Sequence, residues 1–231
     1  MITVFNDLLQ TLFPTYCLGC RRAVPPKTTL CLHCISELPI ANYHLSTSNP
    51  LLKLLNEITP IEAATSLVFF EKQGLVQQLI HQLKFMNKEQ LGSVFGGLLG
   101  EKLLDSSFST CNLVVPIPLH RRRERKRGYN QVTQFGQQLA KQLHVEYIDR
   151  NLIWSKATKT LVRLNKQERV HQIKGAFSVV DPSIFIKKHI LLIDAVVTTG
   201  ATLSEAANCL LQIEGVRVSV ATIAFAMSPL P

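Results

Sequence analysis

Short apolar runs alternate with amphipathic stretches along most of the chain. Runs of about four to eight apolar residues rich in β-branched side chains are typical of buried parallel strands, whereas apolar residues at i, i+3, i+4 and i+7 indicate helices. The strands expected on this basis are residues 65–70, 113–118, 190–193 and 216–226. The helices expected are residues 75–85, residues 90–104, a segment with Val132, Phe135, Leu139 and Leu143 on one face, and one that begins near Thr202. This alternation predicts an α/β fold with an open, mainly parallel sheet and helices on both faces.

Three glycines recur every four residues in the helix expected at 90–104, namely Gly92, Gly96 and Gly100. Small residues at this spacing let a helix approach a neighbour closely, and the charged residues on both sides of them exclude a membrane dimer motif. We expect this face of the helix to pack against the sheet.

The segment 190–202 ends an apolar strand in one acid and then in a turn rich in threonine and glycine. Asp194 is expected at the carboxyl end of the strand, which in parallel sheets opens onto a ligand crevice. Thr202 and Glu205 have the spacing of a capping box, so the next helix should begin near Thr202. The free amides, the helix dipole and the threonine hydroxyls then converge on a point that suits a phosphate. The phosphate-binding residues expected are Thr198, Thr199, Gly200, Ala201 and Thr202.

The carboxylate of Asp194 beside the expected phosphate site narrows the class of ligand that the sequence predicts. Asp194 can accept two hydrogen bonds and is a natural partner for the hydroxyls of a ribose, so phosphate and diol together indicate a sugar phosphate. The alternative is an ordinary buried strand followed by a capped helix.

The N-terminal region carries two C-x2-C pairs separated by ten residues, formed by Cys17, Cys20, Cys31 and Cys34. Each pair can place two thiolates on one metal ion, and two pairs complete a tetrahedral zinc site. His33 is the first substitute ligand to consider. A disulfide pair and redox-active dithiols are the alternatives to zinc.

The 25 basic and 16 acidic residues give a net charge of +9, which favours polyanionic partners. Much of the excess lies in residues 121–127, and either nucleic acid or a pyrophosphate group fits such a run. The competing interpretation is a solvated run of charge.

No run reaches the roughly 18 to 20 apolar residues that span a bilayer, and Asp7 argues against a signal peptide. We therefore expect a cytoplasmic protein without a membrane span.

A polar stretch at 46–60 separates the cysteine array from the predicted sheet. We expect a four-cysteine zinc-binding domain at 1–45, a linker at 46–60 and an α/β domain at 61–231.

The chain resembles the ComF family (ComFC, GntX-like) over nearly its whole length, on features that occur in the family's order. These are the cysteine array, LKF at 83–85, VVPIPLHRRRERKRGYNQ at 114–131, KGAF at 174–177 and LLIDAVVTTGAT at 191–202. The resemblance implies a type I phosphoribosyltransferase-like domain that binds 5-phosphoribosyl-1-pyrophosphate (PRPP) with Mg²⁺, next to a small domain that resembles a zinc ribbon. It also implies a role in natural transformation, where single-stranded DNA is handled on the cytoplasmic side with a partner helicase.

The resemblance also implies roles for individual residues. Asp194 would contact the ribose and is the one catalytic candidate. The pyrophosphate loop would consist of Pro116, Ile117, Pro118, Arg125 and Arg127. The basic run itself, with one neighbouring aromatic residue, suggests that single-stranded DNA binds Arg121, Arg122, Arg123, Lys126 and Tyr129. Tyr129 and Asn130 would orient the basic run, and Lys84 is a further candidate for the anion pocket.

Two positions depart from the pattern of this superfamily. Ala195 stands where a second acid is expected, and Thr198 stands where some purine-using members carry an aspartate. Residues 155–175 match the place of a mobile catalytic loop, for which a charged surface helix is the alternative. We expect a PRPP-binding homologue with a role in transformation; the alternative is an active phosphoribosyltransferase with an unknown acceptor and no DNA role.

Overall fold

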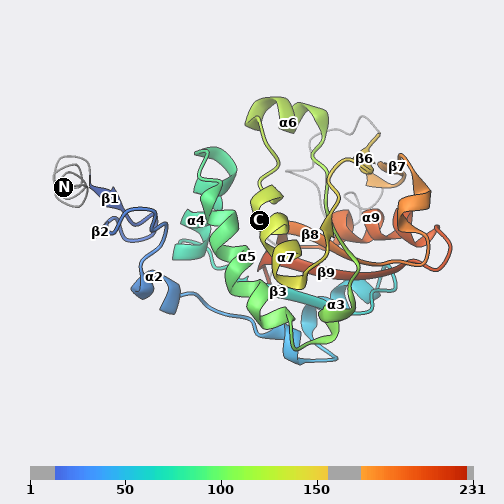
Figure 1. Cartoon of the computed structure of the whole chain (residues 1–231), viewed down its shortest axis with the longest axis horizontal. Coiled ribbons are helices and arrows are strands. Elements are labelled where there is room, and N and C mark those ends of the chain that lie inside the picture. Colours follow the sequence, from blue (N-terminus) through green and yellow to red (C-terminus); the bar gives the residue numbers. More distant parts are fainter. Residues whose placement is uncertain (1–13, 156–172, 228–231) are drawn as a thin grey trace.

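A computed structural model of the chain describes residues 14–155 and 173–227, and its centre is a five-stranded sheet (Figure 1). The strands of this sheet are β3 (Ala64–Phe69), β4 (Leu113–Pro116), β5 (Glu146–Tyr147), β8 (His189–Val197) and β9 (Arg217–Phe225). Their order is β3-β9-β8-β4-β5, and all neighbours run parallel. The prediction of an open, mainly parallel sheet is confirmed.

Helices cover both faces of this sheet, as the apolar runs predicted. One face packs against α4 (Leu75–Phe85), α5 (Gln90–Leu103) and α7 (Thr133–Leu143), and the other against α3 (Pro50–Asn56) and α9 (Ala201–Leu211). Alternate residues of β8 enter the two cores: Leu191 and Ile193 join the first, and Ile190 and Leu192 join the second. A strand buried on both faces is apolar at consecutive positions, which explains why the run 190–193 does not alternate with polar residues.

The glycines of α5 pack against α7 rather than against the sheet. A Cβ added at Gly96 would lie 2.7 Å from the carbonyl oxygen of Phe135, and one added at Gly92 would lie 3.0 Å from the Phe135 amide nitrogen. The expectation of packing against the sheet is therefore wrong, because small residues at this spacing bring the α5 and α7 backbones together.

The segment 46–60, predicted as a linker, contains helix α3. Asn49 caps this helix by accepting a hydrogen bond from the Leu52 amide, and Pro50 occupies the first turn, where its missing N–H costs nothing. Leu51 and Leu55 have no exposed surface and belong to the second core. Helix α3 is therefore part of the sheet domain's packing, whereas the division of the chain into domains stays a prediction.

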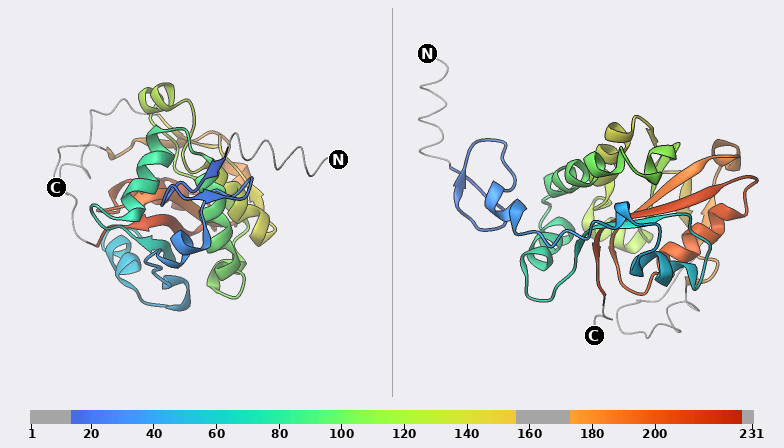
Figure 2. Two further views of the ribbon diagram at one scale, coloured as in Figure 1. Left: turned by 90° about the vertical axis from the view of Figure 1, so that its left-hand side faces the viewer. Right: turned by 90° about the horizontal axis from the view of Figure 1, so that it is seen from below.

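The N-terminal unit lies at one end of the molecule, next to α4 (Figure 2). It consists of the antiparallel pair β1 (Thr15–Tyr16) and β2 (Ala23–Val24), followed by α2 (Leu32–Ser36). The side chain of Gln82 on α4 donates a 2.7 Å hydrogen bond to the carbonyl of Leu18, and Gln78 donates to the carbonyl of Gly19 at 3.2 Å. These bonds attach the cysteine-bearing loop to the sheet domain.

The remaining elements lie around the sheet. Helix α6 (Arg121–Arg127) stands out at the top of Figure 1, and β6 (Leu152–Trp154) pairs antiparallel with β7 (Phe177–Val179) beside α9. Three short 3₁₀ turns, η1 (Tyr43–Leu45), η2 (Ser107–Thr110) and η4 (Pro182–Phe185), join other elements. Most of the predicted catalytic loop, residues 156–172, lies outside the described residues. Within the described ranges, no helix is long and apolar enough to cross a membrane.

Candidate functional site

A crevice opens where β4 ends and β8 continues. The last residue of β4, Pro116, pairs with Ile193, and the Ile117 amide donates a 2.8 Å hydrogen bond to the Ile193 carbonyl. Beyond this point β8 keeps its pairing with β9 as far as Val197. Asp194 is therefore three residues before the end of its strand, and not at the end as predicted. It lies at the point where the neighbouring strand leaves the sheet, which is where open α/β sheets bind ligands.

A cavity of about 380 Å³ occupies this crevice. Its lining comes from Asp194 and the residues after it, from the loop after β4, and from Trp154 and Ile173. Cavities of roughly 300 to 1,000 Å³ hold small organic ligands, so a sugar phosphate fits here. The predicted residues that line it are Ile117, Pro118, Arg123, Arg127, Asp194, Thr198, Thr199, Gly200, Ala201, Thr202 and Lys84.

The predicted phosphate turn connects β8 to α9. Gly200 is the N-cap residue, with a φ of 73° in the left-handed region that favours glycine. The helix begins at Ala201, so the capping box predicted for Thr202 is wrong. Glu205 instead accepts a 2.6 Å hydrogen bond from the Gly175 amide. Because a glycine cap has no side chain to bond the first-turn amides, these amides stay available as donors for an anion.

Helix α3 supports this turn from behind. A Cβ on Gly200 would lie 2.9 Å from the Cδ2 atom of Leu55, and Thr59 donates a 3.2 Å hydrogen bond to the Ser204 carbonyl of α9. The segment predicted as a linker therefore holds the predicted phosphate turn in position.

Three cationic side chains, which we call the cationic wall, line the same cavity as the turn. Lys84, at the end of α4, lines the cavity together with Arg123 and Arg127 of α6. The sequence interpretation grouped Arg125 with the pyrophosphate and Arg123 with nucleic acid. In the structure Arg123 lines the cavity and Arg125 does not, because residues four apart share one face of a helix. A helical periodicity in the basic run would have identified Arg123.

The opposite side of α6 is exposed to solvent. Arg121, Arg122, Arg125 and Lys126 are all exposed, and His120 caps the helix by accepting a 3.2 Å hydrogen bond from the Arg122 amide. Tyr129 is half-buried, and its hydroxyl donates to the carbonyl of Leu83. Asn130 donates a 2.9 Å hydrogen bond to the Ile117 carbonyl. Tyr129 and Asn130 therefore attach the end of the basic run to α4 and to the loop after β4.

The buried charges of the cavity affect one another. Burial raises the pKa of Asp194, although Lys84, the Ala195 amide and the two arginines oppose that rise. Burial lowers the pKa of Lys84, and Asp194 opposes this while Arg127 and Arg123 add to it. Both shifts reflect charged groups removed from water, and a bound ligand that complements them would stabilise both charged forms.

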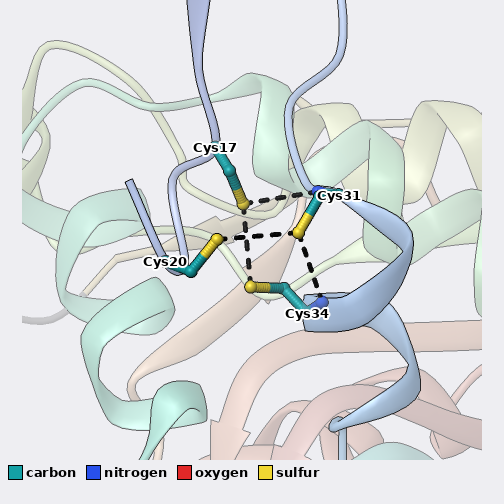
Figure 3. A group of neighbouring side chains, drawn as sticks. All are labelled: Cys17, Cys20, Cys31 and Cys34. Carbon is teal, nitrogen blue, oxygen red and sulfur yellow. Dashed lines mark hydrogen bonds between the residues drawn. The ribbon is translucent and has the colours of Figure 1, made fainter. Parts of the chain in front are cut away.

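The four cysteines converge on one point (Figure 3). The Sγ atoms of Cys17 and Cys34 lie 3.7 Å apart, as do those of Cys20 and Cys31. A zinc tetrahedron with Zn–S bonds of about 2.3 Å has S···S edges of about 3.8 Å, which matches this spacing, whereas a disulfide bond would require about 2.05 Å. His33 is exposed and outside the cluster, which leaves four thiolates as the ligand set for a structural zinc ion.

Backbone amides donate hydrogen bonds to two of the four cysteine sulfurs. The amides of Gly19 and Cys31 donate to the Cys17 sulfur at 3.4 and 3.3 Å, and the Cys34 amide donates to the Cys31 sulfur at 3.4 Å. Burial raises the pKa of Cys17, but amide hydrogen bonds outweigh it and lower the pKa to about 6. A thiolate stabilised in this way is the form that binds zinc.

The described residues of the cavity offer a magnesium ion one carboxylate. Asp194 is the single carboxylate among its lining residues in the described ranges, and three cationic side chains face it. Magnesium prefers oxygen ligands and binds through one or two carboxylates together with substrate phosphates. Within the described residues, the cysteine cluster is the one group of three or more candidate metal ligands. The protein side chains therefore do not fit a resident Mg²⁺ ion.

Residues from outside the predicted set complete the cavity. Trp154 packs edge-on against Phe177, with ring centroids 4.8 Å apart, and against His120 at 5.9 Å. Ile173 lies beside them in the cavity lining. Ile173 falls within the segment 155–175, which matches the place of a catalytic loop. No motif marks Trp154, which lies on β6 and pairs with Phe177 of β7.

Comparisons with known proteins cover both parts of the chain. The profile of the double zinc ribbon domain family matches residues 8–45. Over 200 residues the chain is 30% identical to the DNA utilization protein YhgH of Escherichia coli K12, which covers 85% of this chain and 84% of that protein. Over 199 residues it is 28% identical to competence protein F of Haemophilus influenzae, covering 84% and 83%. Over 107 residues it is 36% identical to competence protein ComFC of Bacillus subtilis, covering 43% and 38%.

The similar solved structures include two phosphoribosyltransferases. An adenine phosphoribosyltransferase from Leishmania tarentolae matches with a TM-score of 0.39 and 14% identity, covering 78% of this chain and 89% of that chain. A hypoxanthine phosphoribosyltransferase from Staphylococcus aureus matches with a TM-score of 0.37 and 15% identity, covering 62% and 70%.

Proposed function

The chain belongs to the ComF family of competence and DNA-utilization proteins, and on this premise we propose that its cavity binds PRPP. We further propose that the protein handles single-stranded DNA on the cytoplasmic side during natural transformation, together with a helicase. Both proposals assign ligands to surfaces of the sheet domain. The zinc ribbon is assigned no ligand besides its zinc ion.

One observation carries the first proposal. A glycine-capped helix N-terminus, the Asp194 carboxylate and a cationic wall line the same cavity. PRPP carries a 5-phosphate, a ribose diol and a diphosphate, and each part has a counterpart there. The turn at Thr198–Thr202 would hold the 5-phosphate, Asp194 would accept hydrogen bonds from the ribose hydroxyls, and Arg127 with its neighbours would hold the diphosphate.

PRPP binding is expected to change the fluorescence of Trp154, because this residue lines the cavity and is the chain's single tryptophan. A titration should saturate with PRPP, and it should need much higher concentrations of ribose 5-phosphate or pyrophosphate, which each lack half of the contacts. Equal responses to PRPP and to an unrelated polyanion such as citrate would rule out the proposed ligand.

The alternative is an active phosphoribosyltransferase with an unknown acceptor and no DNA role. The apolar wall of Trp154 and Ile173 favours it, because such a wall would shield a reacting ribose from water. Exchange of labelled pyrophosphate into PRPP in the presence of a panel of bases and amines detects this activity, and its absence favours a binding function. Any Mg²⁺ that accompanied PRPP would be held by the ligand's own phosphates, since the cavity supplies one carboxylate.

Single-stranded DNA is expected to bind the exposed side of α6 in a sequence-tolerant manner. If about three of its cationic side chains contact phosphates, the slope of log affinity against log salt should be near −2, since each single-strand contact contributes roughly −0.7. Replacing Arg121, Arg122 and Lys126 with alanine should flatten the slope in fluorescence anisotropy titrations. This variant keeps Arg123 and Arg127, which line the cavity.

A matched control removes the same charge elsewhere. The triple variant of the exposed residues Lys53, Lys141 and Lys188 to alanine should keep the wild-type slope. Excess PRPP should leave DNA bound, because the two ligands are assigned to opposite sides of α6. An unchanged affinity and slope in the α6 variant would show that DNA binds another surface.

A further inference from the structure

The cavity contains more positive than negative side chains. Lys84 of α4 and Arg123 and Arg127 of α6 line it, against the single carboxylate of Asp194 among the described lining residues. A sugar diphosphate brings several negative charges to the site. The cations therefore provide part of the charge compensation that a divalent metal ion otherwise supplies.

Position 195 does not offer a second acid, and its surroundings do not suit one. Ala195 has no exposed surface, packs in the core formed with α4, α5 and α7, and is absent from the cavity lining. A carboxylate at this position would be buried in an apolar cluster, which is costly for a charged group. The packing of β8 therefore disfavours an acid at position 195. The cavity lining supplies cations instead.

The cationic wall is held by neighbouring contacts. Arg127 donates a 2.6 Å hydrogen bond to the Gln131 side chain, and its guanidinium carbon lies 5.0 Å from the ring centroid of Phe85. Tyr129 donates to the carbonyl of Leu83, the residue before Lys84. These contacts connect α6 to the end of α4 and keep the charged groups of both helices on the same cavity. A guanidinium that is already positioned loses less entropy when it binds a phosphate.

We propose that Lys84, Arg123 and Arg127 bind the diphosphate of the ligand directly, so that binding does not require a divalent cation. This inference rests on the proposed function, because it concerns the same cavity and the same ligand. Arginine offers paired donors that match phosphate oxygens, and lysine offers a point charge. The lowered pKa of Lys84 agrees with this arrangement, since a polyanion beside the ammonium would restore its charge.

The test is calorimetric titration of the zinc-loaded, full-length protein with PRPP. Buffer and ligand are freed of Mg²⁺ on a chelating resin before mixing, so that no chelator meets the zinc site, and the titration is repeated with saturating Mg²⁺. The affinities under the two conditions are expected to agree within about threefold, because the protein cations compensate the diphosphate charge.

Two variants test the assignment of the cations. Lys84→Met and Arg123→Gln should each lower the Mg²⁺-free affinity by roughly tenfold to a hundredfold, the range for one charge-assisted hydrogen bond. Lys84→Arg should keep most of the affinity, and Lys88→Met, which removes a charge from outside the cavity lining, should bind like the wild type. Arg123 lies on the exposed helix α6, so its replacement tests the cationic wall without altering the core.

The outcomes separate this inference from the proposed function. Binding that appears only with Mg²⁺ would overturn the inference and leave PRPP binding standing. Wild-type affinity for Lys84→Met and Arg123→Gln without Mg²⁺ would also overturn it. No binding under either condition would remove the proposed function itself.

Discussion

Replacing Cys31 with serine is expected to abolish zinc binding and unfold the N-terminal unit while the five-stranded sheet stays folded. The buried apolar residues of this unit within 14–45 are few, namely Cys17, Leu30, Cys34 and Leu38, and two of these are cluster cysteines. Structural zinc contributes on the order of 10 kcal/mol to such small units, so losing one of its ligands removes most of what holds the unit together. Metal analysis should give one zinc ion per wild-type chain and none for the variant.

Limited proteolysis shows which part of the chain unfolds. Cleavage of the Cys31→Ser variant should concentrate before helix α3 and leave a protected fragment that contains the sheet. Cys209→Ser is the matched control, because Cys209 is a half-buried thiol outside the cluster, and this variant should keep its zinc and its resistance. A Cys31→Ser protein that retained one zinc ion and an intact N-terminal unit would contradict the four-thiolate site.

Replacing Gly200 with valine is expected to reduce PRPP affinity by more than about a hundredfold, which corresponds to roughly 3 kcal/mol of lost binding free energy. Valine strongly disfavours a φ of 73°, and its Cβ would lie 2.9 Å from Leu55 Cδ2. The turn must then move, and its amides no longer face the phosphate. Calorimetry measures the affinity, and thermal unfolding checks that the domain remains folded.

A milder variant separates binding from folding. Thr202→Val keeps the shape of the side chain and removes its hydroxyl, so it should weaken PRPP binding by roughly tenfold, as expected for one hydrogen bond to a charged group. Gly97→Val is the control, because a Cβ at Gly97 would meet one side-chain atom at 3.9 Å and this residue lies outside the cavity lining. Wild-type affinity in Gly200→Val would remove the phosphate assignment of the turn.

The local chemistry of both sites could be predicted from the sequence. Paired C-x2-C spacing determines which sulfurs meet on a metal, and the four sulfurs do converge. The apolar run before Asp194 and the Thr/Gly turn after it predicted a strand followed by a helix, which the structure contains. In these cases neighbouring residues along the chain determine the local conformation, so little depends on distant contacts.

Features that depend on tertiary partners could not be predicted in this way. Strand β8 runs past Asp194 because β9 continues to pair with it, and no local signal in 194–197 indicates that partner. Helix α3 is short, and the sequence does not show that Leu51 and Leu55 are buried against the sheet. The cavity residues of α6 depend on residues 121–127 forming a helix, which a run made almost wholly of charged residues does not indicate, since it lacks an apolar stripe.

A crystal structure of the protein with PRPP bound tests the assignment of the cavity most directly. We expect the 5-phosphate against the amides at the start of α9, the ribose hydroxyls on Asp194, and the diphosphate between Lys84 and the arginines of α6. Density for the ligand outside this cavity, or an empty cavity at a saturating PRPP concentration, would contradict the proposed function.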